Sequence, residues 1–295
     1  MTQPTAFAGL RRDAEALAAP LPPLLADAEH LAASVMTGAH GRRRVGQGDE
    51  FWQYRPSHAG DEARMVDWRR SARSEDALFV REKEWQAAQS VMLWLDMGQS
   101  MQFSSHKDIP SKAAEARRLA LALSVLLIRG GERVGLTNLG MPPRAGQVQL
   151  MRLTTAFATE TDAADYAIPD LKAAPLRSRA VFISDFMGPF EPVEQAVTRA
   201  ADRGISGAIL QVLDPQEEAF PFDGRTIFES MGGSLRHETL KAGDLRDRYL
   251  DRLSERKDAL RGLARSIGWQ FHTHHTGTAA SAALLWLYTA LERGH

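Results

Sequence analysis

The sequence contains no cysteine among its 295 residues. Disulfide bonds, cysteine-ligated zinc, iron–sulfur clusters and thiol nucleophiles are therefore excluded. The sequence also has no marked excess of charge of one sign. It contains 36 lysine and arginine residues and 37 aspartate and glutamate residues, which gives a net charge of −1. A balance this close to neutral gives the whole chain no drive toward nucleic acid or an anionic membrane surface.

Long hydrophobic runs are missing as well. The most apolar stretch covers residues 119–128, whereas a membrane span needs about 20 such residues. Near the start of the chain, Arg11, Asp13 and Glu15 interrupt any apolar run of the kind that a signal peptide needs. We therefore expect a cytoplasmic protein without a membrane span.

From residue 91 onward, apolar runs alternate with segments of helical periodicity. Three of the runs end at an aspartate: 91–95 before Asp96, 181–183 before Asp185 and 208–213 before Asp214. Helices are predicted over 111–129 with Ser111 as cap, 193–204, 244–268 with Asp244 as cap, and 279–292. Continuous apolar strands between helices are typical of a parallel sheet that is covered on both faces. The fold class predicted is α/β, with a doubly wound, mostly parallel sheet.

The amino-acid composition and the residue patterns divide the chain into three parts. Residues 1–45 predict a helical arm that prolines interrupt near residue 20. Residues 46–88 are rich in tryptophan, arginine and aspartate, and predict a small β-module with strands near 51–55 and 78–85. Residues 89–293 form the predicted α/β domain.

The strand-end aspartates are the first candidate site. Open α/β sheets bind ligands outside the carboxyl ends of their strands, so Asp96 and Asp185 should lie close together. Two carboxylates at neighbouring strand ends repel each other, and a divalent cation between them would remove that repulsion.

The segment after the first of these strands strengthens this hypothesis. Residues 96–100 read D-M-G-Q-S and resemble the D-x-S-x-S motif of von Willebrand factor A domains, which hold Mg²⁺ at a metal-ion-dependent adhesion site. The resemblance implies a metal site of Asp96, Ser100, Thr161 and Asp185. Gly98 stands where the motif has serine, so we expect weak or absent Mg²⁺ binding that Gly98→Ser should strengthen.

A longer string of residues carries a more specific resemblance. It comprises Gly46, Gly48, Glu50, Phe51, Arg55, Gly60, Asp61, Arg64, Asp67, Trp68, Ser71, Arg73, Val80, Arg81 and Glu82. With the strand that follows, it resembles the DUF58 family over residues 40–290. That resemblance implies a von Willebrand A-like domain, no established catalytic activity, and a MoxR-type AAA+ ATPase as partner. We therefore expect a non-enzymatic protein-interaction module whose strand-end rim binds a protein, with or without Mg²⁺.

The charged part of this string has two interpretations. Arginine and carboxylate side chains can pair in bidentate geometry, so the string is either a lattice that fastens the module or a charged docking face. The residues of the docking face would be Arg55, Asp61, Arg64, Asp67, Trp68 and Arg73.

Other functions remain open at this point. One alternative is a metal-dependent hydrolase that uses Asp96, Asp185 and Asp214, and another is nucleic-acid binding through residues 42–44 and 69–73. His272, His274 and His275 suggest a metal site, although a polar strand end explains them as well. No G-x-x-x-x-G-K-[ST] motif is present, which excludes an ATPase of the P-loop class.

Overall fold

The computed structural model describes residues 21–38, 51–57, 66–73, 78–83, 88–158, 164–233 and 236–292. It divides into two compact units. The larger unit holds residues 1–39 and 89–295, and the smaller unit holds residues 40–88. The helix predicted within the N-terminal arm therefore packs as part of the larger unit.

The smaller unit contains a two-stranded antiparallel ladder. Strand β1 (Phe51–Pro56) pairs with β2 (Phe79–Lys83), close to where the sequence predicts two strands. Helix α3 (Trp68–Ser71) lies between them in the chain. The carboxylate of Asp67 caps this helix by accepting a hydrogen bond from the amide of Arg70 (3.0 Å).

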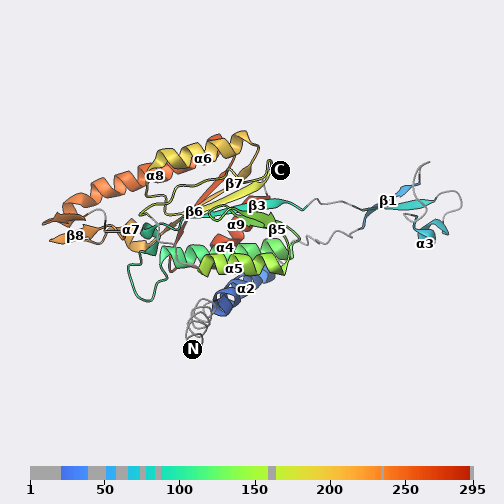
Figure 1. The fold of residues 1–295 in the computed structure, drawn as a ribbon, viewed down its shortest axis with the longest axis horizontal. Helices are drawn as coiled ribbons and strands as arrows, with labels where there is room; N and C mark the ends of the chain where they lie inside the picture. Colours follow the sequence, from blue (N-terminus) through green and yellow to red (C-terminus); the bar gives the residue numbers. More distant parts are fainter. Residues whose placement is uncertain are drawn as a thin grey trace, which may run out of the picture. The chain divides into compact units, whose positions relative to one another are not determined.

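The larger unit is organised around a six-stranded sheet with the order β10-β7-β6-β3-β4-β5 (Figure 1). Its strands are β3 (Ser90–Leu95), β4 (Arg133–Leu136), β5 (Met141–Arg144), β6 (Arg179–Ser184), β7 (Ser206–Leu213) and β10 (Gln270–His275). Only the edge strand β5 runs antiparallel to its neighbour, and the other pairs of this sheet are parallel. The predicted α/β class with a mostly parallel sheet is confirmed.

Helices cover both faces of this sheet (Figure 1). One face carries α2 (Leu21–Gly38), α4 (Lys112–Arg129), α5 (Gln147–Ala158) and α9 (Ala280–Glu292). The other face carries α6 (Phe190–Asp202) and α8 (Arg246–Ser266). This three-layer arrangement follows from the apolar strands, whose side chains need cover on both sides.

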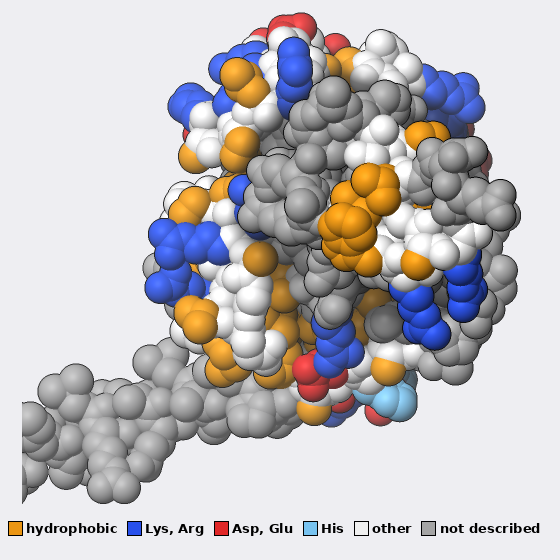
Figure 2. Space-filling model, turned by 90° about the vertical axis from the view of Figure 1, so that its right-hand side faces the viewer, with side chains coloured by type: hydrophobic (Ala, Val, Ile, Leu, Met, Phe, Trp, Pro, Cys, Tyr) orange, Lys and Arg blue, Asp and Glu red, His pale blue; other side chains and the backbone are white. Residues whose placement is uncertain are grey.

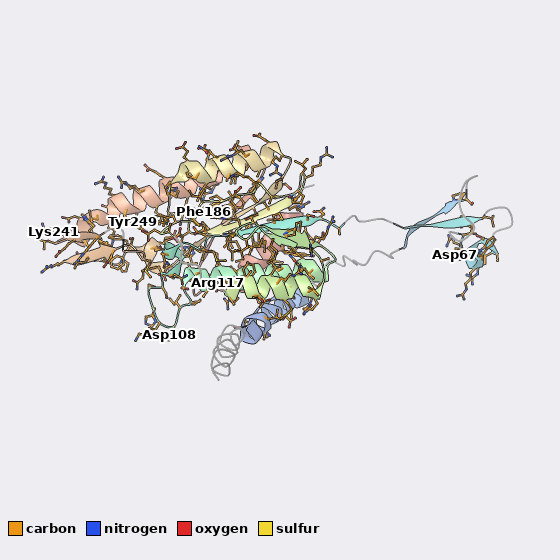
Figure 3. All side chains as sticks on the ribbon, in the orientation of Figure 1. Asp67, Asp108, Arg117, Phe186, Lys241 and Tyr249 are labelled. Carbon is orange, nitrogen blue, oxygen red and sulfur yellow. The ribbon has the colours of Figure 1, made fainter. Side chains whose placement is uncertain are left out.

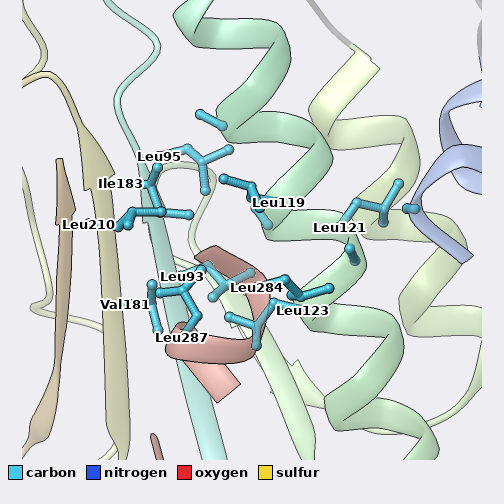
Figure 4. Close-up of a cluster of buried hydrophobic side chains, with 14 of the residues drawn as sticks. Leu93, Leu95, Leu119, Leu121, Leu123, Val181, Ile183, Leu210, Leu284 and Leu287 are labelled. Carbon is cyan, nitrogen blue, oxygen red and sulfur yellow. The ribbon is translucent and has the colours of Figure 1, made fainter. Parts of the chain in front are cut away.

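The core under α4 and α9 is built from aliphatic side chains of neighbouring strands (Figure 4). Its labelled members are Leu93, Leu95, Val181, Ile183 and Leu210 from the strands, and Leu119, Leu121, Leu123, Leu284 and Leu287 from the helices. Burying one such side chain contributes roughly 1.5–3 kcal/mol. The loops that follow β3 and β6 are therefore anchored at a well-packed part of the sheet.

Several shorter elements complete the larger unit. They are η2 (Gln99–Gln102), α7 (Pro215–Ala219), β8 (Thr226–Glu229), β9 (Arg236–Thr239) and η3 (Ala242–Leu245). Strands β8 and β9 pair with each other in antiparallel orientation. Within the described ranges, no helix has both the length and the hydrophobicity needed to cross a bilayer.

The helix caps are predicted correctly in one case and wrongly in another. The hydroxyl of Ser111 accepts a hydrogen bond from the amide of Ala114 (3.2 Å) and caps α4, as predicted. Asp244 does not cap α8, because the short helix η3 precedes it and Leu245 occupies the cap position without a side-chain bond.

Candidate functional site

The two central strands of the sheet end side by side. In β3 and β6, Leu95 lies opposite Ile183, and the amide of Asp96 donates to the carbonyl of Ile183 (2.9 Å). From β3 the chain continues through α4 to β4 on one side, whereas from β6 it continues through α6 to β7 on the other. Open α/β sheets bind ligands at such a reversal of direction. Asp96 and Asp185, which follow these two strands, lie at this edge as the strand pattern predicts.

The carboxylate of Asp96 is buried and is used within the fold, since the residue is only 4% exposed. One oxygen accepts hydrogen bonds from the amides of Gly98 (2.7 Å) and Ala167 (3.3 Å), and the other accepts one from the hydroxyl of Ser184 (2.7 Å). Burial, together with the negative charge of Asp185, raises the pKa of Asp96 from 3.8 to about 6. Asp96 thus holds two loops against the sheet and does not present a free carboxylate.

The side chain of Lys112 lies between the carboxylates of Asp185 and Glu217. The Nζ atom of Lys112 lies 2.8 Å from Oδ2 of Asp185 and 2.5 Å from Oε1 of Glu217. We call these three residues the ion-pair cluster. Burial acts to lower the pKa of Lys112, but the two carboxylates raise it overall, so the ammonium stays charged at neutral pH. The side chains of Lys112 and Asp185 are 1% and 0% exposed, which places this charge balance inside the protein.

Sequence reasoning missed Lys112, although one local signal marks it. It is the first residue of α4, directly after the cap Ser111. A cation is disfavoured at this position because the positive end of the helix dipole lies there. A lysine in the first turn that is also buried therefore needs an acidic partner, and Asp185 and Glu217 supply two.

Gly98 is required by the close approach of two loops. The amide of Ser100 donates to the carbonyl of Asp165 (3.0 Å), which brings the loop after β3 against the segment that begins at residue 164. A Cβ atom at position 98 would lie 2.6 Å from the carbonyl oxygen of Asp165 and 2.8 Å from Oδ1 of Asp96. The glycine is therefore a packing requirement of this structure, and a serine would not fit without movement of the backbone.

These residues do not fit a magnesium ion. Mg²⁺ needs a near-octahedral set of oxygen ligands, whereas Oδ2 of Asp185 binds Lys112 and both oxygens of Asp96 accept hydrogen bonds. The hydroxyl of Ser100 is buried and has no hydrogen-bond partner among the described residues, and Thr161 lies outside them. Among the side chains that the structure describes, no three acidic or histidine groups are placed to hold a metal.

The geometry of this edge changes two expectations. A serine at position 98 would not complete a metal site, because the ammonium of Lys112 already provides the positive charge there and Cβ has no room. The acidic rim itself cannot touch a partner protein either, because Asp96 and Asp185 are buried by the chain's own loops.

Replacing Gly98 by serine should lower the free energy of unfolding by about 1–3 kcal/mol, the usual cost of overpacking. The variant should show no micromolar binding of Mg²⁺. Urea unfolding and titration calorimetry measure the two effects. The matched control is Gly262→Ser in α8, where nothing lies within 4 Å of an added Cβ and little change is expected. A Gly98→Ser variant as stable as the wild type, with Mg²⁺ bound, would contradict this interpretation.

Asp214 serves the helix that follows it. Its Oδ1 accepts a hydrogen bond from the amide of Gln216 (2.8 Å), and its Oδ2 accepts one from the amide of Ser105 (2.9 Å). Glu217 completes a capping box at the start of α7. Both carboxylate oxygens thus bind backbone N–H groups, and this geometry gives no support to a hydrolase with Asp214 as a metal ligand.

The histidines of β10 each contact a different residue. The three pairs are His272 with Trp286, His274 with Glu115, and His275 with Glu218. The rings of His272 and Trp286 stack with centroids 5.0 Å apart, and Nε2 of His274 lies 3.0 Å from Oε1 of Glu115. The histidines do not converge on a common point, which agrees with the interpretation as a polar strand end.

The docking face predicted on the smaller unit is described only in part. Asp67 is buried and caps α3, whereas Trp68 is 59% exposed and Arg73 is exposed. Outside the described side chains lie Arg55, Asp61 and Arg64. Because single exposed aromatic residues are common on protein surfaces, the docking face stays a prediction.

Nucleic-acid binding through residues 42–44 and 69–73 stays a prediction, and Arg69, Arg70 and Arg73 of the second group are exposed. Residues 42–44 lie outside the described part of the chain. On the face drawn in Figure 2, the coloured lysine and arginine side chains stand in separate groups, with hydrophobic and uncharged side chains between them. Affinity for nucleic acid depends on basic groups that follow the phosphate backbone together.

Two pockets border the strand ends. A pocket of about 400 Å³ is lined by Asp96, Tyr166 and Phe186 among others, and one of about 530 Å³ by Glu217, Phe220 and others. Figure 3 places Phe186 and Tyr249, which lines the second pocket, toward the end of the unit where β6 and β7 finish. This edge therefore offers largely apolar and aromatic hollows to solvent, while the residues Asp96 and Asp185 are almost fully buried.

The comparison with protein families decides the family. The model of DUF58, described as a protein of unknown function, matches residues 53–259. The chain belongs to the DUF58 family. Curated proteins of similar sequence are uncharacterized proteins of Mycobacterium bovis and Mycobacterium tuberculosis, 27% identical over an alignment of 233 residues that covers 73% of this chain and 71% of theirs.

Two solved structures also resemble this DUF58 chain. One is the conserved hypothetical protein BatB from Bacteroides thetaiotaomicron, with a TM-score of 0.41. The other is an aerotolerance-related membrane protein from Bacteroides fragilis, with a TM-score of 0.44. Each is 14% identical and covers 70% of this chain and 100% of its own. Likenesses this distant assign no role to any residue here.

Proposed function

We propose that this DUF58 protein is a non-enzymatic protein-interaction module with a von Willebrand A-like domain, and that it works without a metal ion. The observation that carries the proposal is the position of Lys112 between Asp185 and Glu217 at the strand ends. One buried ammonium group pairs there with two carboxylates, so the groups on which catalysis or metal binding would depend are engaged within the fold. What remains accessible at this edge is a recognition surface of apolar pockets.

The proposed partner is a MoxR-type AAA+ ATPase, because the resemblance of this sequence to the DUF58 family implies such a partner. The chain has no P-loop of its own, so a nucleotide-driven process that involves it needs such a partner. Protein-interaction sites often combine apolar hollows with a polar rim, as the carboxyl edge of this sheet does.

Affinity purification of the tagged full-length chain from its native host, followed by mass spectrometry, tests the partnership. We expect a MoxR-type ATPase to be recovered and to bind again when both proteins are purified. If the purified pair does not associate in the presence of ATP, ADP or no nucleotide, the proposed partner is wrong.

The non-enzymatic part of the proposal has its own test. A screen of phosphatase and esterase substrates with Mg²⁺ or Mn²⁺ should show no turnover above background. Turnover that disappears in an Asp96→Ala variant with an unchanged circular dichroism spectrum would favour the hydrolase alternative and overturn the proposal.

A further inference from the structure

The larger of the two pockets is built mainly from aromatic side chains, and we call it the aromatic pocket. Its walls include Phe220, Phe222, Phe228 and Tyr249, and its volume is about 530 Å³. The ring of Phe220 lies 5.3 Å from that of Phe222, 5.7 Å from that of Phe228 and 4.8 Å from that of Tyr249, measured between centroids. A hollow of this size and lining takes a large apolar side chain.

The aromatic pocket is held in shape by the backbone around Phe220. This residue has a φ of 40° and a ψ of 66°, a left-handed conformation that is rare for a bulky side chain. Its carbonyl accepts hydrogen bonds from Nε (3.0 Å) and Nη2 (2.8 Å) of Arg246, which fix the turn after α7. Unfavourable backbone conformations persist where the surroundings impose them, and they are frequent at binding sites.

The charged side chains at the aromatic pocket that lack an ion-pair partner among the described residues are two arginines. Arg248 and Arg252 line it from successive turns of α8, and both side chains are exposed. Among the described residues, neither guanidinium forms an ion pair. The acidic group that lines the pocket is Glu217, whose carboxylate is paired with Lys112. Two unpaired arginines one turn apart suit the recognition of carboxylates.

From this juxtaposition we infer that the aromatic pocket binds an acidic peptide segment of a partner protein, with an aromatic or long aliphatic side chain inserted and neighbouring carboxylates on Arg248 and Arg252. A peptide suits the site better than an enclosed lipid chain does, because Phe222, Phe228 and Tyr249 are only partly buried and the hollow is open. This inference rests on the proposed function and names the chemistry that the partner presents.

Peptide binding to the purified full-length chain tests the inference. The probes are fluorescein-labelled peptides with Trp, Phe, Leu or Met flanked on both sides by Asp and Glu, compared with counterparts flanked by Lys and Arg and with acidic peptides that carry Ser as the central residue. Fluorescence anisotropy should show at least one acidic apolar peptide that binds 10-fold or more tightly than its basic and its Ser counterparts.

Variants of the protein locate the binding. Arg248→Glu combined with Arg252→Glu should weaken that peptide at least 10-fold, and Phe228→Ala should weaken it at least 5-fold. The matched control is Arg265→Glu, an exposed arginine of the same helix that does not line the pocket. Thermal unfolding confirms that each variant is folded, and the double arginine variant, which changes only exposed side chains, keeps the test decisive if Phe228→Ala is unstable.

The outcomes separate this inference from the proposed function. If no acidic peptide binds better than its basic counterpart, or if the arginine reversal has the same effect as Arg265→Glu, the inference is wrong. If the MoxR-type ATPase binds the wild type and the pocket variants equally, the inference fails while the partnership stands. If the peptides bind as expected but the ATPase does not, the pocket serves another acidic partner and the partnership is wrong.

Discussion

Replacing Lys112 by methionine should lower the free energy of unfolding by about 3–5 kcal/mol at pH 7, the usual cost of removing one partner of a buried ion pair. The loss arises because Asp185 and Glu217 would be left as buried carboxylates without a counter-charge. Urea unfolding followed by circular dichroism measures it. At pH 7 the full contribution of the lysine is present, because its pKa is raised above 10.5 and its stabilising effect is lost only at more alkaline pH.

Two further variants distinguish charge balance from a simple packing defect. In the triple variant Lys112→Met, Asp185→Asn and Glu217→Gln, the cluster is neutral and most of the lost stability should return. The matched control is Lys172→Met, whose side chain is 86% exposed and pairs with Asp170 at 3.4 Å. Exposed pairs of this kind contribute little, so a change within about 0.5 kcal/mol is expected.

The ion-pair cluster would be misinterpreted if Lys112→Met had no larger effect than the Lys172→Met control. A triple variant as unstable as the single one would show that the shape of the lysine matters and its charge does not. Either result would remove the main support for a site that is closed by an internal cation.

The inner strands β3, β6 and β7 were predictable because each contains a short apolar run with a polar end. Residues 91–95 and 181–183 are apolar without alternation, which only a strand buried on both faces requires. Helix α4 was predictable for a different reason, since Ser111 marks its start and an apolar helical pattern follows. The local sequence was thus sufficient to predict most of the strands and helices that form the layers of the larger unit.

The region from residue 140 to 158 was not assigned, and its two elements differ in how well the sequence shows them. Strand β5 contains Pro142 and Pro143, which an edge strand tolerates but which conceal it from a strand pattern. Helix α5 buries Leu150, Leu153 and Phe157 at helical spacing, so its pattern is present in the sequence.

The candidate site was predictable only up to its strand ends. The positions of Asp96 and Asp185 follow from the strands that precede them, and strand order then brings them to one edge. Lys112, the first residue of α4, and Glu217, in the capping box of α7, also lie at this edge of the sheet. Their pairing joins residues 105 positions apart, which no local pattern reports. A motif resemblance therefore suggested a metal where the fold supplies an ammonium group.

The stability of the wild type should fall as the pH rises from about 4 to about 7, relative to an Asp96→Asn variant. Burial and the charge of Asp185 raise the pKa of Asp96 from 3.8 to about 6, so the folded state holds a proton that the unfolded state has released. A group with a raised carboxyl pKa stabilises the fold fully below its unfolded pKa, and that contribution is lost as the pH passes its folded pKa. At about 1.4 kcal/mol for each pKa unit, the loss amounts to about 3 kcal/mol.

Urea unfolding of both proteins between pH 4 and pH 8 measures this effect as the difference between two curves, because all other titrating groups are shared. Asparagine keeps an oxygen that accepts hydrogen bonds from the amides of Gly98 and Ala167, and it carries no charge that Asp185 repels. The free energy of unfolding of the variant should therefore rise relative to that of the wild type as the pH rises. Asp170→Asn is the matched control for an exposed carboxylate, since the side chain of Asp170 is 57% exposed. A flat difference, or a wild type that becomes more stable relative to Asp96→Asn as the pH rises, would mean that Asp96 is ionised in the folded state and stabilised by its hydrogen bonds, and the edge would then hold one more buried negative charge.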